Sequence, residues 1–521
     1  MANKDKFIEE MAQGYTFSGP SVLLGGAMLD GAFLPGTQIR IPLKTMNRHG
    51  LIAGATGTGK TKSLQMLAEG LAANGVSCLM MDIKGDLSGI AMPGTTNPKI
   101  DDRASKIGFT WQAAGHSVEF LTLSAEKGAR LRATISEFGP VLFSKILGLN
   151  DTQGGVVAVV FKYADDNALP LLDLKDFKKT LNYLGNEGKA EIEQEYGALA
   201  STTVSTILRK VVELEQQGAD AFFGETSFDV DDLVGFDNDG KGLISIIRVT
   251  DIQDRPKLFS SFMLQLLAEI YASFPEQGDA EQPKLCIFID EAHLVFQEAS
   301  SVLLQQIEAI IKLIRSKGVG VYFITQNPAD VPESILAQLG MKIQHSLRAF
   351  TAKDRKAIKL AAENYPISEH YNTEDLLIAL GIGEALVSVL SERGTPTPLA
   401  HTLMCPPASR MDILSPAEID GMLAKSRLVA KYNREVDSQS AYEILNAKLA
   451  MAQQSSQQEA PAGKAESEGQ EGGMMDTVSD VMKNPIVRSF GRTLASGLAR
   501  GLLGVLGVSG TRRRKAGSSW F

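Results

Sequence analysis

The sequence predicts an α/β fold with a mainly parallel sheet, and two observations support this prediction. First, short apolar runs with strand character alternate with helical stretches, the order that crossover connections between parallel strands require. Second, this alternation resumes after a long segment with helical spacing, so we expect a helical insertion in the sheet domain. The predicted strands are 49–54, 76–82, 117–123, 242–249, 284–290, 320–325, 342–350 and 384–390.

The composition is that of an ordinary globular chain, with 44% hydrophobic and 22% charged residues among 521. The net charge of -9 argues against a protein that passively coats nucleic acid, but not against one that contacts a strand through a few residues. We find neither a leader nor an apolar run long enough to span a membrane, so we expect no membrane contact. Three scattered cysteines without metal-ligand spacing favour a reduced, cytoplasmic compartment.

Changes in composition divide the chain into five expected segments. The first is Gly-rich and strand-like, the second carries the alternating pattern, and the third reads as a polar helix. The fourth is low in complexity and the fifth is basic. They are a short N-terminal β-rich subdomain at 1–45, an α/β core at 46–405 with its helical insertion at about 136–235, a helical extension at 406–452, a disordered linker at 453–480 and a basic C-terminal tail at 481–521.

A glycine-rich segment between the strand at 49–54 and a predicted helix from Lys60 to Ala73 matches the pattern G-x-x-x-x-G-K-[ST] in full. Backbone N–H groups at a helix N-terminus suit closely packed phosphate charges, and glycines let the chain curl around them. Lys60 would contact the β and γ phosphates of ATP, and Thr61 would bind Mg²⁺. The predicted cofactor-binding residues are Gly54, Ala55, Thr56, Gly57, Thr58, Gly59, Lys60 and Thr61.

This predicted set ends at Thr61. Position 62 does not hold a second threonine but a lysine, Lys62, so we add no further residue to the cofactor-binding set.

Two acids, Asp290 and Glu291, stand at the end of the apolar run at 284–290, at the sheet edge where open α/β sheets bind ligands. We expect Asp290 to hold magnesium, through water, and Glu291 to orient and polarise the attacking water. Acids also cap strands for structural reasons alone. The complete phosphate-binding pattern in the same chain favours the hydrolytic interpretation.

Other polar residues follow predicted strands at the same edge. Gln326 would sense the γ phosphate or position the water, although a simple strand-end amide remains an alternative. Asp82, Lys84 and Asp86 follow the strand at 76–82 and would line the edge too. For these three the alternative is a loop turn stabilised by Gly85.

Three cations are candidates to stabilise transition-state charge on a neighbouring subunit's nucleotide. Lys342 and Arg348 are six residues apart in one predicted strand, so they would share a face. Arg315, before the strand at 320–325, is the third candidate. We predict that Arg348 is catalytic, and a structural role stays the alternative for each of them.

These motifs together resemble one family, the bacterial branch of the HerA-like ATPases, within the wider HerA and FtsK group of ring motors. The likeness covers roughly residues 20–405 and is carried by NRHGLIAGATGTGKT, DIKGD, CIFIDEAH, IRSKGVGVYFITQNPADVP, HSLRAF and GEALVSVLSERGTP. It implies a RecA-like P-loop NTPase core, nucleotide at the subunit interfaces of a homo-hexamer, translocation along double-stranded DNA and a nuclease partner. Two departures are the short segment ahead of the P-loop and Lys342, where several related motors have arginine.

Three functions are compatible with these motifs. The first is an ATP-hydrolysing ring motor that translocates on or unwinds DNA. The second is an ATPase motor acting on protein in a secretion-like complex, and the third is a regulatory module that binds ATP and scarcely hydrolyses it. The pair Asp290-Glu291 argues against the third function, because a simple binding module needs no hydrolytic carboxylate.

The tail at 481–521 holds eight Lys or Arg residues and no acid. Its apolar part, 493–510, precedes four consecutive cations at 512–515. Three interpretations stay open for this tail. It can be a peripheral helix that docks on an acidic membrane or partner, or an electrostatic arm for DNA phosphates. The third is a structural role, either as a flexible solubilising tail or as a helix that packs back on the ring.

Overall fold

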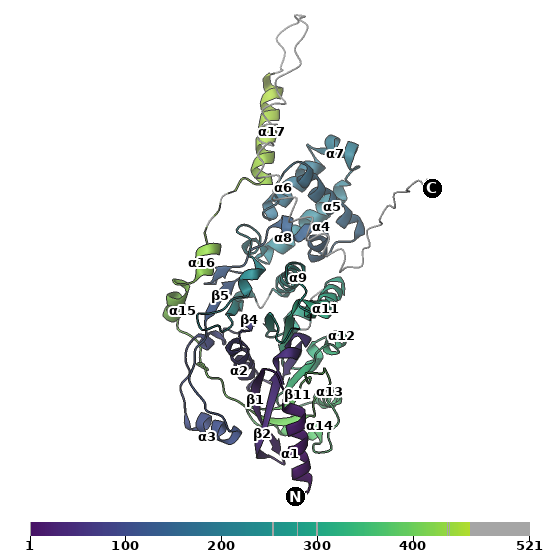
Figure 1. The fold of residues 1–521 in the computed structure, drawn as a ribbon. Helices are drawn as coiled ribbons and strands as arrows, with labels where there is room; N and C mark the ends of the chain where they lie inside the picture. The colour runs from purple at the N-terminus through teal and green to yellow at the C-terminus, as the bar shows by residue number, and fades with distance from the viewer. Residues whose placement is uncertain are drawn as a thin grey trace, which may run out of the picture. The chain divides into compact units, whose positions relative to one another are not determined.

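The structure is a computed structural model that describes residues 2–458, apart from Ala125, 253–254, 279, 298–300, 435 and 437 (Figure 1). The chain forms two compact units. One comprises Met1–Ala133 with Glu213–Asp437, and the other Thr134–Val212 with the described residues of Ser438–Phe521. Among the described residues, no helix combines the length and the apolar character needed to cross a bilayer.

The first unit is built on a 12-stranded sheet with the order β2-β1-β12-β11-β10-β3-β9-β8-β4-β7-β5-β6. All pairs from β10 to β6 are parallel, and the pairs from β2 to β10 are antiparallel. The strands are β1 Ser21–Leu29, β2 Ala32–Pro42, β3 Gly50–Ala53, β4 Ser77–Asp82, β5 Val118–Thr122, β6 Ala129–Arg130, β7 Ile244–Arg248, β8 Leu285–Ile289, β9 Val319–Thr325, β10 Met341–Gln344, β11 Glu384–Ser388 and β12 Ala400–Met404.

The apolar runs of the sequence form the buried central strands of the sheet. Every residue of β3, β4, β8 and β9 is buried, as expected for parallel strands that are covered on both faces. The α-helices that lie wholly in this unit are α1 Ala2–Tyr15, α2 Lys60–Ala73, α3 Pro98–Ile107, α9 Pro256–Ser273, α10 His293–Phe296, α11 Ser301–Ile314, α12 Glu333–Leu336, α13 Ala352–Glu363, α14 Thr373–Ala379, α15 Pro416–Leu423 and α16 Arg427–Tyr432.

The N-terminal segment extends the main sheet, although we expected it to form a small subdomain of its own. Strand β1 pairs with β12, and a Cβ on Gly25 would lie only 2.1 Å from the Leu403 carbonyl oxygen. Helix α1, which the sequence did not predict, buries its apolar side in the same core, and its Tyr15 hydroxyl donates hydrogen bonds to Val387 O and Pro398 O.

The predicted strand at 342–350 is wrong in its second half. Strand β10 ends at Gln344, after which Ser346 O accepts a hydrogen bond of 2.8 Å from Ala55 N, in the glycine-rich loop. Leu347 N then donates to Leu377 O at 2.9 Å. These contacts with distant segments turn the chain out of the sheet, so Lys342 and Arg348 do not share a strand face.

The second unit is helical and contains α4 Ile135–Ile146, α5 Asp151–Asp166, α6 Leu174–Gly185, α7 Lys189–Glu195, most of α8 Ser201–Gln216 and α17 Ala441–Gln458. Helix α17 joins it through hydrogen bonds from Ala441 N to Pro170 O and from Tyr442 N to Asp176 Oδ1. The compact helical segment ends at Val212, short of the expected boundary near 235. The reason is that Gly235 belongs to the first unit, where it exchanges hydrogen bonds with Ser77 Oγ.

Helices α15 and α16, in the expected helical extension, belong to the first unit, whereas α17 belongs to the second. The expected disordered linker at 453–480 is wrong at its start, because helix α17 continues through residues 453–458. The rest of the linker, from 459 onward, and the whole basic tail at 481–521 lie outside the described residues.

Candidate nucleotide-binding site

Four neighbouring parallel strands bring the predicted site residues to one edge of the sheet. They lie in the order β3, β9, β8 and β4, and their carboxyl ends meet at that edge. Gly54 follows β3, Gln326 follows β9, Asp290 follows β8, and Asp82 ends β4. This is the edge at which open α/β sheets bind ligands.

The glycine-rich loop from Gly54 to Gly59 has a backbone conformation that favours glycine at three positions. Gly54, Gly57 and Gly59 have φ values of 152°, 79° and 117°. A Cβ on Gly54 would lie 2.5 Å from the Cβ of His345. Gly59 is the N-cap of α2, so the loop ends at the positive end of a helix of 14 residues.

Lys60 lies against this loop and is only 7% exposed. Its Nζ donates hydrogen bonds to Gly54 O at 2.6 Å and to Ala55 O at 3.1 Å. Burial lowers the pKa of Lys60, the charge of Lys84 lowers it further, and the nearby carboxylates oppose both effects. Thr58 stabilises the loop, because its Oγ1 donates a hydrogen bond to Ala55 O at 2.7 Å. Its carbonyl oxygen also accepts a hydrogen bond from Gly383 N at 3.0 Å, which connects the loop to the segment before β11.

The first turn of α2 meets the loop after β4. Thr61 Oγ1 donates to Asp86 Oδ2 at 3.3 Å, while Asp86 Oδ1 is buried and has no hydrogen-bond partner among the described residues. Asp82 shapes this loop, since it accepts hydrogen bonds from Gly85 N at 2.8 Å and Asp86 N at 3.1 Å. Burial raises the pKa of Asp82 to about 7. Asp82 therefore forms the turn, and Asp86 faces the site.

Lys62, the next residue of α2, contacts another part of the chain. Its Nζ donates hydrogen bonds to Gln65 Oε1 at 3.3 Å and to Met411 O. Burial lowers the pKa of Lys62, and the charge of Asp86 opposes this effect. These contacts join α2 to the segment before α15 through Lys62, and the cofactor-binding set that ends at Thr61 stays a prediction.

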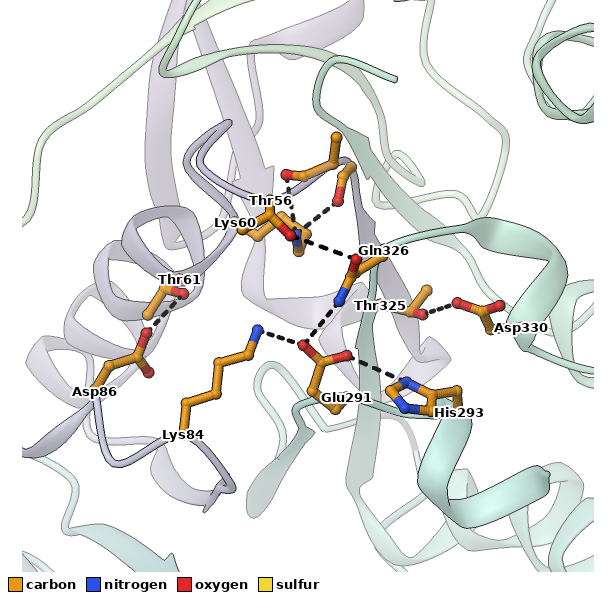
Figure 2. Close-up of polar contacts among 12 residues, drawn as sticks. Thr56, Lys60, Thr61, Lys84, Asp86, Glu291, His293, Thr325, Gln326 and Asp330 are labelled. Atoms are coloured by element: carbon orange, nitrogen blue, oxygen red, sulfur yellow. Dashed lines mark hydrogen bonds and ion pairs between the residues drawn. The ribbon is translucent and has the colours of Figure 1, made fainter. Parts of the chain in front are cut away.

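Glu291 stands in an unusual backbone conformation at the end of β8, with φ of 46°. Strained residues of this kind persist where the surrounding structure holds them, and they cluster at functional sites. Its Oε1 forms an ion pair with Lys84 Nζ, and its Oε2 lies 3.2 Å from His293 Nδ1 (Figure 2). Burial favours the neutral acid, but the hydrogen bond and charge of Lys84 outweigh it and hold the pKa of Glu291 below its usual range.

Asp290, beside it, is 4% exposed. Burial raises the pKa of its carboxyl to about 6, Lys84 opposes this rise, and the negative charge of Glu291 adds to it. A cation bound next to Asp290 would favour the ionised form and so reverse this rise.

Gln326 connects the two halves of the site. Its Oε1 accepts from Thr56 Oγ1 at 3.4 Å, and its Nε2 donates to Glu291 Oε1 at 3.4 Å (Figure 2). One amide side chain thus spans the space between the glycine-rich loop and the carboxylate that we predicted to act on water.

Of the three candidate cations, the structure brings one to the loop. Arg348 Nη2 lies 3.4 Å from Thr56 O of the same chain. Lys342 Nζ instead donates to Asn364 O at 2.8 Å, and Arg315 is exposed at the start of the short segment Arg315–Lys317. The action of Arg348 on a neighbouring subunit stays a prediction.

Sequence reasoning missed the part played by two side chains. Lys84 was considered only as one of several loop residues, and His293 was not considered, although both contact Glu291. His293 is two residues beyond Glu291 and begins α10, so a polar residue at the start of the helix after the acids was an available signal. The partner of Lys84 lies about 200 positions away, and no local pattern indicates it.

The residues present fit a magnesium nucleotide. Within the part of the chain that the structure describes, no group of three or more His, Cys, Asp or Glu side chains is placed to hold a metal ion. Mg²⁺ needs no such cage, because it uses one or two carboxylates together with substrate phosphates and water. The Thr61 hydroxyl, the Asp290 carboxyl and the unpaired Oδ1 of Asp86 supply oxygen ligands of the kind that Mg²⁺ prefers.

Comparison with known proteins gives one family and one curated relative. The family described as "Helicase HerA-like C-terminal" matches residues 29–514. The chain is 20% identical over 370 residues to the DNA double-strand break repair helicase HerA of Sulfolobus acidocaldarius, covering 67% of this chain and 64% of that protein. The chain thus matches less than two thirds of the length of this curated relative.

Solved structures with the same fold include the plasmid coupling protein TrwB. Its trigonal form in complex with sulphate gives a TM-score of 0.52 at 13% identity, covering 78% of this chain and 94% of that one. Its complex with a non-hydrolysable ATP analogue gives 0.51 at 15% identity, covering 78% and 95%. At such identities the likeness concerns the fold, and it confirms the predicted α/β, RecA-like P-loop core.

Proposed function

The chain belongs to the HerA-like helicase C-terminal family of P-loop ATPases, and we propose that it is a motor that hydrolyses ATP to translocate along, or unwind, double-stranded DNA as a homo-hexameric ring. The observation that carries the proposal is the link from Thr56 through Gln326 to Glu291. It joins the loop suited to a polyphosphate to a carboxylate suited to activating water.

In this proposal, the loop amides and the N-terminus of α2 bind the phosphates, and Lys60 places its charge on the β and γ phosphates. Thr61 and Asp290 hold Mg²⁺, with the unpaired oxygen of Asp86 nearby. When bound, the ion neutralises the charge that develops on the phosphates.

Glu291 accepts a hydrogen bond from the attacking water and so orients it toward the γ phosphate. Two features support this role. The Lys84 ion pair keeps Glu291 ionised, and the backbone at φ 46° holds the carboxylate at the end of β8. Gln326 positions the same water from the side of the loop, because its amide already contacts both Thr56 and Glu291.

DNA as the substrate is supported by the family and by the curated relative, which is named a DNA double-strand break repair helicase. The homo-hexamer and the nuclease partner are predictions from the family resemblance. Translocation through a ring would need only a few contacts with the duplex, which agrees with a net charge of -9.

The test is ATP hydrolysis measured with and without duplex DNA, with the oligomeric mass recorded on the same sample. We expect DNA to raise the rate of the assembled protein several-fold, and Glu291→Gln to abolish the DNA-dependent part. An assembled ring whose hydrolysis rate is the same with and without DNA would contradict the DNA-motor proposal.

The second candidate is an ATPase motor that acts on protein in a secretion-like complex. Its support is the fold shared with TrwB, which is described as a bacterial conjugative coupling protein. This candidate predicts co-purification with a membrane-bound complex, and loss of that association when residues 481–521 are deleted.

A further inference from the structure

Lys84 contacts the carboxylate that we propose to act on water. It follows β4 in the loop that Asp82 shapes, and its ammonium forms an ion pair with Glu291 Oε1 (Figure 2). The two residues are therefore joined across neighbouring strands of the sheet, since β4 pairs with β8.

Oε1 is the engaged oxygen of the Glu291 carboxylate in this arrangement. Oε1 contacts both Lys84 Nζ and Gln326 Nε2. Oε2 lies on the His293 side, 3.2 Å from Nδ1, and has no hydrogen-bond partner among the described residues (Figure 2). Each carboxylate oxygen has two lone pairs, so Oε1 has no acceptor position left for water while both donors stay in place. Oε1, the oxygen on the side of Gln326, can therefore accept from an attacking water only after one donor has left.

Lys84 is the donor best able to leave. Its side chain is 39% exposed, whereas that of Glu291 is 6% exposed. A lysine ammonium sits on a flexible four-carbon stem, so it can exchange one anion for another without backbone movement. His293 is placed by α10, and Gln326 has a shorter side chain that stays within reach of both Thr56 and Glu291.

A second anion would also attract Lys84. Its charge lowers the pKa of Lys60, so the two ammonium groups are close enough to repel each other. A phosphate bound next to Lys60 would relieve that repulsion and would compete with Glu291 for Lys84. Among the phosphates of ATP, the γ phosphate is the one that faces the hydrolytic carboxylate.

We propose that Lys84 senses the γ phosphate: it pairs with Glu291 Oε1 when no γ phosphate is present, and moves to the γ phosphate when ATP binds, which frees Oε1 to orient water. The inference rests on the proposed ATPase function and adds a regulatory step to it. It makes Lys84 a ligand that distinguishes ATP from ADP. A merely structural Lys84, which neutralises a buried acid, would not distinguish them.

The test is equilibrium binding of a non-hydrolysable ATP analogue and of ADP, each with Mg²⁺ and without DNA. In Lys84→Met we expect analogue affinity to fall about tenfold, the size of one hydrogen bond to a charged group, and ADP affinity to stay within about twofold. Lys44→Met is the matched control, because Lys44 is 38% exposed, is ion-paired with Glu281 and precedes β3 at the opposite edge of the sheet. We expect no change in either affinity for this control.

Glu291→Gln provides the second half of the test. Removing the competing carboxylate should strengthen analogue binding, and adding Lys84→Met should then weaken it by a larger factor than in the wild type. Lys84→Gln, which keeps a hydrogen-bond donor for Glu291, is measured in parallel in case the Met variant unfolds, and carries the same expectation. The energetic coupling between positions 84 and 291 is read from this cycle.

Equal losses of analogue and ADP affinity in the Lys84 variants, or strictly additive effects of the two substitutions, would overturn the sensor role while leaving the proposed ATPase intact. If wild-type protein binds neither nucleotide, the proposed function fails, and the sensor role fails with it.

Discussion

Gln326 Nε2 donates a hydrogen bond of 3.4 Å to Glu291 Oε1, across the ends of the neighbouring strands β9 and β8. The same amide accepts from Thr56 at 3.4 Å. Both contacts are long, so the amide is in reach of each partner without being locked to either. A side chain placed in this way can follow a water molecule that lies between the γ phosphate and the carboxylate.

Gln326→Met should therefore lower the rate of hydrolysis by about tenfold to a hundredfold, in the range of a lost water-positioning contact. The affinity for ATP should stay within about twofold, because Gln326 contacts the loop through the Thr56 hydroxyl and not through the phosphate-binding amides. Gln338→Met, at an exposed glutamine after α12, is the control and should change neither quantity. Equal rates for the Gln326 variant and the wild type would remove Gln326 from the catalytic set.

Gly54→Ala should weaken nucleotide binding and destabilise the first unit. The new Cβ would lie 2.5 Å from the Cβ of His345, in a backbone conformation with φ of 152°. Overpacking and strain of this kind cost about 1–3 kcal/mol each. Gly155→Ala is the control, because nothing lies within 4 Å of a Cβ at this position in α5. It should stabilise its helix by about 0.5–1 kcal/mol, and both values can be measured by denaturant unfolding.

Acid should destabilise the protein partly through His49. Its Nδ1 accepts a hydrogen bond from Val321 N at 3.0 Å, and Nε2 lies 2.8 Å from Ile311 O. Burial lowers its pKa to about 4, below the ordinary value of 6.5. The unfolded chain therefore binds the proton more readily, so stability is complete above pH 6.5 and is lost as the pH falls toward 4.

The loss from this one residue is about 3 kcal/mol over that range. Unfolding free energies measured between pH 7 and pH 4 should show it, and His49→Gln, which keeps a donor and an acceptor, should reduce the slope. His345, whose pKa burial also lowers to about 4, contributes a similar slope that remains in this variant. An unchanged slope in His49→Gln would exclude His49 as a source of the acid sensitivity.

Arg348 and Lys342 should differ in their effect on hydrolysis. Arg348 lies beside the phosphate loop, whereas the Lys342 ammonium is bound to Asn364 O. We expect Arg348→Gln to lower the rate at least about tenfold, the scale of a lost charge on the transferring phosphate, and Lys342→Gln to change it by less than about threefold. Thermal unfolding of both variants separates loss of the cation from loss of the fold. A larger rate defect in Lys342→Gln would restore it as the functional cation.

The sequence predicted the parts of this site that depend on local chemistry. The phosphate loop before Lys60 and the acids Asp290 and Glu291 follow apolar strands directly, and the parallel order of those strands brings them together. The contacts that were missed join distant segments. Lys84 forms an ion pair with Glu291, and Ser346 O, beyond the end of β10, accepts a hydrogen bond from Ala55 N in the loop. In each case the two partners are far apart in the sequence, so no local pattern contains both of them.

The N-terminal segment shows the same limit for the fold. Its strand character was visible in the sequence, but its partner was not, because β1 pairs with β12 near the other end of the domain. Helix α1 has few apolar residues, among them Phe7 and Met11, and its burial depends on the surface that β2 and β11 create. Local propensity alone therefore gave no basis for placing it.

The central claim is that Glu291 activates water for a nucleotide held by the loop at Lys60. The most direct measurement is single-turnover hydrolysis of ATP by wild type and Glu291→Gln, with the bound nucleotide quantified in both. We expect the variant to bind ATP at least as well as the wild type and to hydrolyse it at least about a hundredfold more slowly. Equal single-turnover rates, with ATP bound in both proteins, would contradict the claim.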